Sequence, residues 1–338
     1  MDMGLQDFLI RPRGGWADVR ERDVLHIGLV NNMADAALES TERQFFRWVA
    51  RAAPELPIRW HLFSLHTMPR GELGNLHLVR EYYGKPRDIY RTRLHALIVT
   101  GTEPLQADLR QEPYWSELTE LFDWIEQEGP PALFSCLAAH AAVLHFDGIE
   151  RQPLASKRFG MFDHVPVAQH PLTASLTGPT PIAHSRWNDI SAEALEDAGY
   201  EVLTYAPDAG VDMFVKRKRN ELLFQQGHPE YDGATLGREY RRDVRRYLEG
   251  SKDIYPDMPA NYFTGAQAER LERFCKRAMR ERHESLMSAF PAIEPPRIGR
   301  RSAIAEPLGI WLRQIQQQRN EHNGTAIRRR PLAGLQAP

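Results

Sequence analysis

Residues 131–146 read PALFSCLAAHAAVLHF, and this stretch is the strongest indicator of fold class in the chain. A short apolar run, Pro131 to Phe134, ends at Ser135-Cys136, and an Ala-rich segment with helical spacing follows. The pattern predicts a strand, a sharp turn and a helix, with a cysteine on the turn. A thiol there lies at a helix N-terminus, where amide groups and the helix dipole favour thiolate and can stabilise an oxyanion. The alternative is a buried structural cysteine, the commoner fate of a free Cys.

Composition permits an enzyme without naming its reaction. With 338 residues and 42% hydrophobic content, the chain can bury a large core. Its net charge of −2 creates no overall electrostatic field that would attract nucleic acid or a membrane surface. Its two cysteines, Cys136 and Cys275, exclude a disulfide scaffold and a multi-cysteine zinc site. The N-terminus MDMGLQDFLI is unlike a signal peptide, and the apolar runs are too short to span a bilayer. We therefore expect a cytoplasmic protein with no metal centre.

Predicted strands and helices alternate along the first half of the chain. The expected strands are Val24–Val30, Ile58–Leu65, Ala96–Val99 and the Pro131 strand, and the expected helices are Glu39–Ala53, Tyr114–Gln127 and the segment after Cys136. This alternation predicts an α/β fold, a mostly parallel sheet flanked by helices, with a ligand site at the C-terminal strand ends. Both Gly101 and Cys136 fall at such ends. Residues 67–92 are polar and are expected to form a long surface loop.

The second half is predicted to contain shorter strands and a helical C-terminal region. Short strands are expected near Ile182–His184, Glu201–Tyr205, Met213–Lys216 and Leu222–Gln226, and helices at Asp232–Leu248, 265–289 and 303–320. Pro291–Arg301 is expected to be a linker, and 322–338 a frayed tail. The predicted organisation is an N-terminal arm at 1–20, one α/β domain at 21–263, and a helical, basic C-terminal extension and tail at 264–338.

A second group of chemically useful residues lies in FQQGHPEYD, residues 224–232. His228 and Glu230 are two apart, so in an extended turn both side chains point to the same side. A nucleophile needs a histidine that takes and returns its proton and a third group that orients the histidine. His140, one turn after Cys136, is the rival base. We expect His26, His145 and His184 to be ordinary core or edge residues.

Several motifs, in this order, resemble the homoserine O-acyltransferase family, usually called homoserine O-succinyltransferases, which has a class I glutamine amidotransferase-like fold. The matching segments span roughly residues 20–265 and are LIVTG at 97–101, Tyr114-Trp115, FSCLAAHAA around Cys136, Lys157 with Gly160, His184-Ser185-Arg186-Trp187, GHPEYD, Arg242-Asp243 and Asn261-Tyr262-Phe263. The resemblance implies the same fold and acyl transfer from acyl-CoA to L-homoserine by a ping-pong reaction, the first committed step of methionine biosynthesis. It also implies a homodimer, with acyl-CoA as co-substrate and no resident cofactor.

The resemblance also implies roles for individual residues. Cys136 would take the acyl group as a thioester, His228 would be the general base, and Glu230 would orient it. The positions that hold the amino acid or the acyl group in the family are Lys157, Ser185 and Arg242. Arginine suits a substrate carboxylate because it binds in bidentate fashion. The plainer interpretations are a surface lysine, a strand-end turn serine and an arginine on a solvated helix face.

Three segments depart from the family pattern. The loop NNMADAAL at 31–38 is longer than the family loop and has no lysine. The family position that selects the acyl group, glycine for succinyl and glutamate for acetyl, falls on Leu105, with Glu103 as a substitute candidate. Leucine lacks a charge that would repel succinyl, yet its bulk could fill the space. We favour the succinyl donor over acetyl mainly because succinyl transfer is the most familiar activity of the family that the chain resembles. Residues 264–300 form a basic helical insertion, with three alternatives for its role: a cover over the site, a dimer contact, or no catalytic part.

Alternative functions stay open on the same residues. L-serine is one methylene shorter than homoserine, a difference of about 1–3 kcal/mol in an apolar pocket, so an altered first loop could change the acceptor. A glutamine amidotransferase or a cysteine hydrolase shares the cysteine turn and the His-x-Glu pair. A non-catalytic binding protein on this fold is disfavoured by the presence of Cys136, His228 and Glu230 together.

Overall fold

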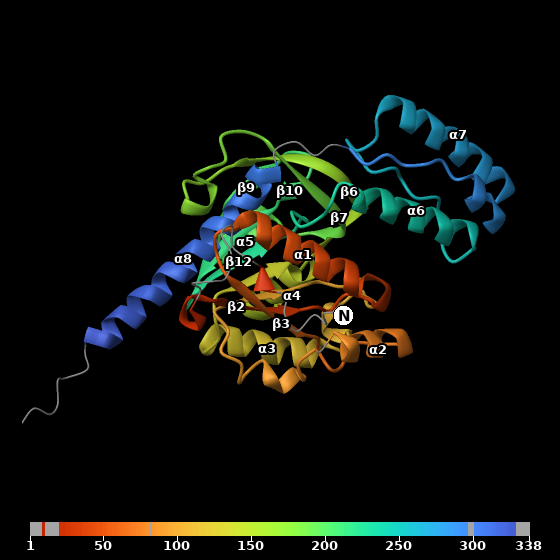
Figure 1. Ribbon diagram of the computed structural model, residues 1–338. Helices are drawn as coiled ribbons and strands as arrows, with labels where there is room; N and C mark the ends of the chain where they lie inside the picture. Colours follow the sequence, from red (N-terminus) through yellow and green to blue (C-terminus); the bar gives the residue numbers. More distant parts are fainter. Residues whose placement is uncertain (1–8, 11–19, 82, 297–300, 329–338) are drawn as a thin grey trace, which may run out of the picture.

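The computed structural model describes residues 9–10, 20–81, 83–296 and 301–328, and a mixed α/β sandwich forms its main body (Figure 1). Within these ranges, eight strands form one sheet in the order β1-β3-β2-β4-β5-β12-β11-β8. Their bounds are Leu9–Ile10 (β1), Ile58–Phe63 (β3), Leu25–Val30 (β2), Ala96–Val99 (β4), Ala132–Ser135 (β5), Glu221–Gln225 (β12), Met213–Arg217 (β11) and Glu201–Val202 (β8). The strands from β3 to β12 run parallel, and the outer pairs are antiparallel. The expected mostly parallel sheet is confirmed.

Helices cover both faces of this sheet. On one face lie α3 (Trp115–Gln127), α4 (Leu137–Asp147) and α5 (Ala192–Asp197), and on the other lie α1 (Leu38–Ala52) and α8 (Arg301–Arg328). Alternation along the central strands explains the two cores, since Val99 and Phe134 belong to the first core, whereas Ile98 and Leu133 belong to the second. These side chains are fully buried, so the central strands read as continuous apolar runs.

The stretch 67–92 differs from its prediction as one long loop. It contains α2 (Glu72–Arg80) and a short 3-10 helix at Pro86–Asp88. Three apolar residues of α2, Leu73, Leu76 and Val79, are exposed, and Leu78 is half-buried. The helix therefore lacks a buried apolar stripe, which is the sequence signal by which a surface helix is recognised.

A second, antiparallel sheet packs beside the main body and was only partly predicted. Within the described ranges its order is β10-β9-β6-β7, with bounds Gly210–Val211 (β10), Thr204–Ala206 (β9), Gln152–Pro166 (β6) and Thr180–Asp189 (β7). The long strand β6 was missed because much of it is exposed and its sequence does not alternate cleanly. At Gly160, φ is 149° and an added Cβ would lie 2.4 Å from the carbonyl oxygen of Ala260, so only glycine allows the neighbouring chain to approach β6.

The helices near the C-terminus form two separate packing units. α6 (Thr235–Leu248) and α7 (Gly265–Glu281) pack together against the second sheet and project from the body, with a 3-10 helix at Glu284–Ala289 (Figure 1). α8 instead lies along α1, where Trp311 and Leu312 are buried, so the helix expected at 303–320 is confirmed and is longer. Residues 297–300 of the expected linker, 329–338 of the tail and most of the arm at 1–20 lie outside the described residues. No helix within the described ranges is long and apolar enough to cross a membrane.

Candidate active site

Cys136 occupies the turn between β5 and α4, as the sequence predicts. Its backbone has φ 53° and ψ −115°, a conformation that is rare for a residue other than glycine. Its N–H donates to the carbonyl oxygen of Gln225 at 2.7 Å, which ties the turn to the adjacent strand β12. Strained backbone of this kind gathers at functional sites and persists only where the surroundings hold it. The thiol is partly exposed and stands at the N-terminus of α4, the positive end of the helix dipole.

The segment after β4 passes directly against the cysteine turn. A Cβ added to Gly101 would lie 2.7 Å from the backbone nitrogen of Leu137, the first residue of α4. A side chain there would block the approach, so glycine is required by contact rather than by its backbone angles. The three strand ends β4, β5 and β12 therefore meet at one place, the C-terminal edge of the parallel sheet.

His228 and Glu230 follow β12 and lie beside Cys136. The backbone N–H of His228 donates to the carbonyl oxygen of Ala183 at 2.8 Å, and the ring Nδ1 of His228 lies 2.8 Å from Oε1 of Glu230. The Glu230 side chain is only 4% exposed, so this carboxylate is shielded from solvent where it contacts the imidazole. Burial lowers the pKa of His228, but the negative charges and hydrogen bonds of Cys136 and Glu230 outweigh it and hold that pKa well above its ordinary value. The site therefore keeps a cationic imidazolium beside the Cys136 sulfur, which is the partner that a thiolate nucleophile requires.

The rival histidine has a different environment. His140 is buried in α4, and burial, with the charges of Arg186 and Arg151, lowers its pKa to about 3. His184 is fully buried and stacks on His164 with ring centroids 4.9 Å apart, and burial likewise lowers its pKa well below the ordinary value. Both imidazoles are therefore neutral near pH 7, unlike His228.

Lys157, Ser185 and Arg242 come from three different elements and meet on the α6 side of the site. Lys157 lies within β6 and Ser185 within β7, rather than in a surface loop and a strand-end turn. Lys157 Nζ lies 3.2 Å from Oδ2 of Asp243 and 4.1 Å from the centre of the Phe159 ring. Its side chain is 14% exposed, so it is a largely buried cation rather than a solvated one.

Two carboxylates, to which the sequence reasoning gave no role, organise these residues. Glu239 accepts the Ser185 hydroxyl at 2.6 Å and lies 3.8 Å from Lys157 Nζ. Asp243 forms ion pairs with Lys157 and with Arg242, and Nη2 of Arg242 lies 2.8 Å from its Oδ1. Positions 239, 242, 243 and 246 recur at helical spacing on one face of α6, which is the signal that could have found them. The run of arginines on the same helix made its charged residues look like an ordinary solvated face, so this spacing was not noticed.

Arg242 has features of both roles considered from the sequence, a substrate-binding arginine and an arginine on a solvated helix face. Its side chain is 46% exposed, yet it is paired with Asp243 on its own helix. Burial lowers its pKa, but the charges of Asp243 and Glu239 outweigh this and raise it. The guanidinium thus borders both solvent and the carboxylates of Glu239 and Asp243, which we call the acidic cluster.

The two acyl-selector candidates lie on the loop after β4. Leu105 is 66% exposed, and its N–H and that of Gln106 donate to Oε1 of Glu112. Glu103 pairs with Arg246 of α6, with Oε1 and Nη1 3.2 Å apart. Arg246 also lies 3.8 Å from Asp243, so the loop and the acidic cluster share one charge network.

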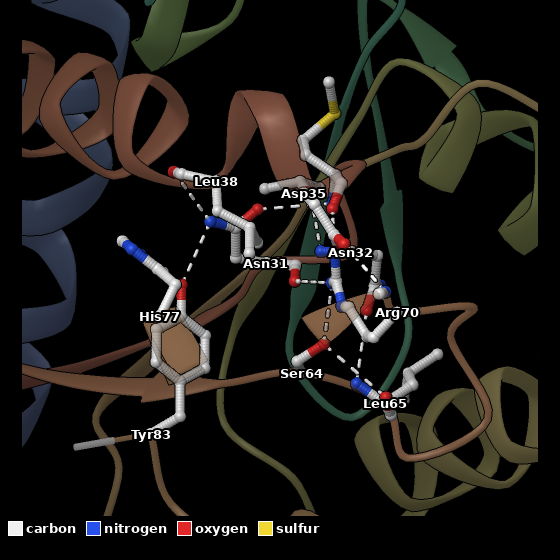
Figure 2. Close-up of polar contacts among 12 residues, drawn as sticks. Asn31, Asn32, Asp35, Leu38, Ser64, Leu65, Arg70, His77 and Tyr83 are labelled. Carbon is white, nitrogen blue, oxygen red and sulfur yellow. Dashed lines mark hydrogen bonds and ion pairs between the residues drawn. The ribbon is translucent and has the colours of Figure 1, made fainter. Parts of the chain in front are cut away.

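The lysine-free loop after β2 is held by a buried arginine from the segment before α2 (Figure 2). Arg70 donates to the carbonyl oxygens of Asn31 and Met33 and to Ser64, and it also contacts Asp35. Its side chain is only 5% exposed. We call these five residues the Arg70 cluster. It connects the ends of β2 and β3.

The Arg70 cluster is continuous with the cysteine turn through β4. The N–H of Asn32 donates to Oγ1 of Thr100 at 2.9 Å, and Thr100 directly precedes Gly101. Asp35 also accepts the N–H of Gly71 at 2.8 Å, just before α2 begins. The loop after β2 therefore has a defined conformation although it departs from the family pattern. No group of three or more His, Cys, Asp or Glu side chains within the described part of the chain has a metal-binding arrangement.

Comparison with known proteins agrees with the motifs. Residues 13–283 match the protein family described as homoserine O-succinyltransferase. The homoserine O-succinyltransferase of Methylorubrum extorquens is 46% identical over 80% of this chain and 80% of its own, and that of Rhodopseudomonas palustris is 45% identical over 79% and 80%. A solved glutamine amidotransferase from Methylobacillus flagellatus aligns with 86% of this chain and 94% of its own, at 11% identity and a TM-score of 0.46. The chain belongs to the homoserine O-succinyltransferase family, a family of transferases.

Proposed function

We propose that this protein transfers a succinyl group from succinyl-CoA to the hydroxyl of L-homoserine through a thioester on Cys136. One observation carries the proposal: Cys136, His228 and Glu230 converge at the ends of two adjacent parallel strands, with the pKa of His228 raised by both partners. This is the arrangement that nucleophilic acyl transfer requires. The names of the relatives supply the acceptor and the donor.

The first half-reaction acylates the cysteine. The Cys136 thiolate attacks the thioester carbonyl of succinyl-CoA, and the oxyanion is stabilised by amides at the start of α4. The carbon–sulfur bond to CoA then breaks, and the imidazolium of His228 gives its proton to the departing CoA thiolate. Acylation removes the thiolate charge that raised the pKa of His228, so the imidazole becomes a neutral base for the next step.

The second half-reaction regenerates the starting pair. His228 takes the proton of the homoserine hydroxyl as its oxygen attacks the Cys136 thioester. The carbon–sulfur bond breaks, O-succinylhomoserine leaves, and thiolate and imidazolium are restored. Each proton and each bond balances over the cycle, which predicts ping-pong kinetics.

The acidic cluster on α6 gives the acceptor its binding groups. Glu239 is 14% exposed and keeps lone pairs beyond the one that accepts the Ser185 hydroxyl, so it is a partner for the α-ammonium group. Arg242 and Lys157 are the cations for the carboxylates of the acceptor and of the succinyl group. Arg242, at the border with solvent, is placed to exchange Asp243 for a substrate carboxylate.

The loop after β4 favours a succinyl donor. Leu105 carries no charge, and the carboxylate of Glu103 is engaged by Arg246. A neutralised Glu103 repels the distal carboxylate of succinyl much less than a free one would. Acetyl-CoA is the competing donor and L-serine the competing acceptor.

The same proposal sets the cellular context. The enzyme uses acyl-CoA as a co-substrate with no resident cofactor, acts as a homodimer in the cytoplasm, and supplies methionine biosynthesis. The pair of free thiols in the sequence suits a reducing compartment.

Intact-protein mass spectrometry tests the proposal. The purified protein is incubated with succinyl-CoA or acetyl-CoA and then chased with L-homoserine or L-serine. We expect a succinyl adduct on Cys136 that L-homoserine discharges faster than L-serine does. If neither donor leaves an adduct while Cys136 still reacts with iodoacetamide, the acyltransferase mechanism is wrong, and a glutaminase assay without CoA tests the amidotransferase alternative.

A further inference from the structure

Tyr231 contacts the imidazole of His228 face to face. The two rings are stacked, with centroids 4.2 Å apart and planes inclined by 16°. The two residues lie on one short turn, where the N–H of Tyr231 also donates to the carbonyl oxygen of His228 at 3.2 Å. The phenol ring therefore supports the imidazole along one face, while Glu230 holds its Nδ1 edge.

The hydroxyl of the same tyrosine reaches the acidic cluster on α6. It donates to Oε1 of Glu239 at 2.6 Å. Burial and the charge of Glu239 hold the pKa of Tyr231 well above its ordinary value, so the hydroxyl stays protonated and continues to donate. The other oxygen of Glu239 accepts the hydroxyl of Ser185, also at 2.6 Å. Two hydroxyl donors, from β7 and from the turn after β12, thus fix the orientation of this carboxylate.

Tyr231 therefore joins the base to the proposed ammonium site through one rigid side chain. An aromatic ring has two rotatable bonds, and here its face and its hydroxyl are both engaged. We propose that Tyr231 is a positioning residue that sets the separation between the amino group of the acceptor and the hydroxyl that reacts. Tyr231 thereby takes part in the selection of homoserine over serine, because the two amino acids differ by one methylene between those two groups. This role of Tyr231 rests on the proposed function.

The two contacts of Tyr231 serve different half-reactions. Acylation by acyl-CoA involves no amino acid, so it depends on the ring that supports His228 and not on the hydroxyl. Transfer to the amino acid depends on both, because Glu239 must hold the ammonium group at the correct distance from the imidazole. Separating the half-reactions therefore separates this role from a purely structural one.

The test compares Tyr231→Phe, Tyr231→Leu and the control Tyr240→Phe in the full-length protein. Tyr240 is the next residue after Glu239, and its buried hydroxyl contacts Tyr255 instead of the site. Acylation is followed as CoA released in a single turnover, and transfer as discharge of the acyl-enzyme by L-homoserine and by L-serine over a range of concentrations.

We expect Tyr231→Phe to acylate within about twofold of wild type, since phenylalanine keeps the stacked ring. Its KM for homoserine in discharge should rise about fivefold, and the homoserine-to-serine ratio of kcat/KM should fall about threefold or more. Tyr231→Leu should slow acylation as well, and Tyr240→Phe should match wild type in every measurement.

Two results would overturn the inference. If Tyr231→Phe discharges with both amino acids as wild type does, the hydroxyl sets no distance. If Tyr231→Phe instead slows acylation and transfer by the same factor, Tyr231 only supports His228. A wild-type protein that CoA thioesters do not acylate at all would overturn the proposed function, and this control precedes the variants.

Discussion

Two polar clusters lie at the C-terminal edge of the same sheet, and they are satisfied to different degrees. In the Arg70 cluster, both guanidinium Nη atoms are hydrogen-bonded to the protein, and only Nε is left without a partner (Figure 2). Around Cys136, three buried polar atoms within the described residues have no hydrogen-bond partner: Glu230 Oε2, His184 Nε2 and Gln225 Oε1.

The difference indicates what each cluster contributes. A buried polar atom without a partner costs about 1–3 kcal/mol, so folded proteins keep such atoms mainly where chemistry requires them. A buried guanidinium whose Nη groups hold main-chain carbonyls instead defines the shape of a loop. We therefore expect changes near Cys136 to reduce turnover with little loss of stability, and changes in the Arg70 cluster to do the reverse.

Cys136→Ala should have the largest effect. Turnover should fall by about 10³-fold or more, because no thioester can form, while the thermal unfolding midpoint changes little. Activity and unfolding are measured on the same preparation, with Cys275→Ala on α7 as the matched control that keeps wild-type activity. Appreciable turnover by Cys136→Ala would contradict the thioester mechanism.

Arg70→Ala should reduce the free energy of unfolding by about 2–3 kcal/mol, because two main-chain carbonyls and Asp35 lose a buried donor. Chemical denaturation measures this, and turnover per folded molecule should stay within about threefold of wild type. Arg80→Ala, an exposed arginine at the end of α2, is the control that should change neither. A variant that is stable but inactive would break the comparison and make the Arg70 cluster part of the site.

The ionisation of the pair can be measured by alkylation. Since the pKa of His228 is raised, the imidazolium persists at pH 6, and we expect this neighbouring cation to make the Cys136 sulfur more reactive there. In a Cys275→Ala background, His228→Ala should therefore lower the rate of iodoacetamide alkylation at pH 6 by about tenfold, and the difference should shrink as pH rises past the thiol pKa. Equal rates at pH 6 would show that His228 does not stabilise the thiolate. His228→Ala should also reduce turnover nearly as much as Cys136→Ala.

Arg242→Lys should have the smallest effect of the four. A lysine keeps the charge but cannot bind a carboxylate in bidentate fashion, so KM for the amino acid should rise about fivefold with little change in kcat. Steady-state kinetics measure this against Arg245→Lys, an exposed arginine on the same helix. An unchanged KM would place Arg242 on the solvated face of α6.

The fold was predictable where the residue pattern is local. β2, α1, β4, α3, β5 and α4 each carry their own apolar periodicity, so each was predicted from its own residues. α2 and β6 lack a buried stripe or a clean alternation, and contacts with distant residues stabilise them instead, such as Asp35 with Gly71 and the pairing of β6 with β7. Sequence windows contain no information about such partners.

The candidate site divides in the same way. By itself, the sequence determined the cysteine turn, the His228–Glu230 pair and their location at strand ends, because spacing along one strand or turn decides which side chains share a side. Only the tertiary structure brought Lys157, Ser185, Tyr231 and Glu239 together, since they come from β6, β7, a turn and α6. It also decided that His140 is buried and neutral whereas His228 is charged. The physical reason is that burial and electrostatic partners, which set a pKa, are properties of the assembled fold rather than of the local chain.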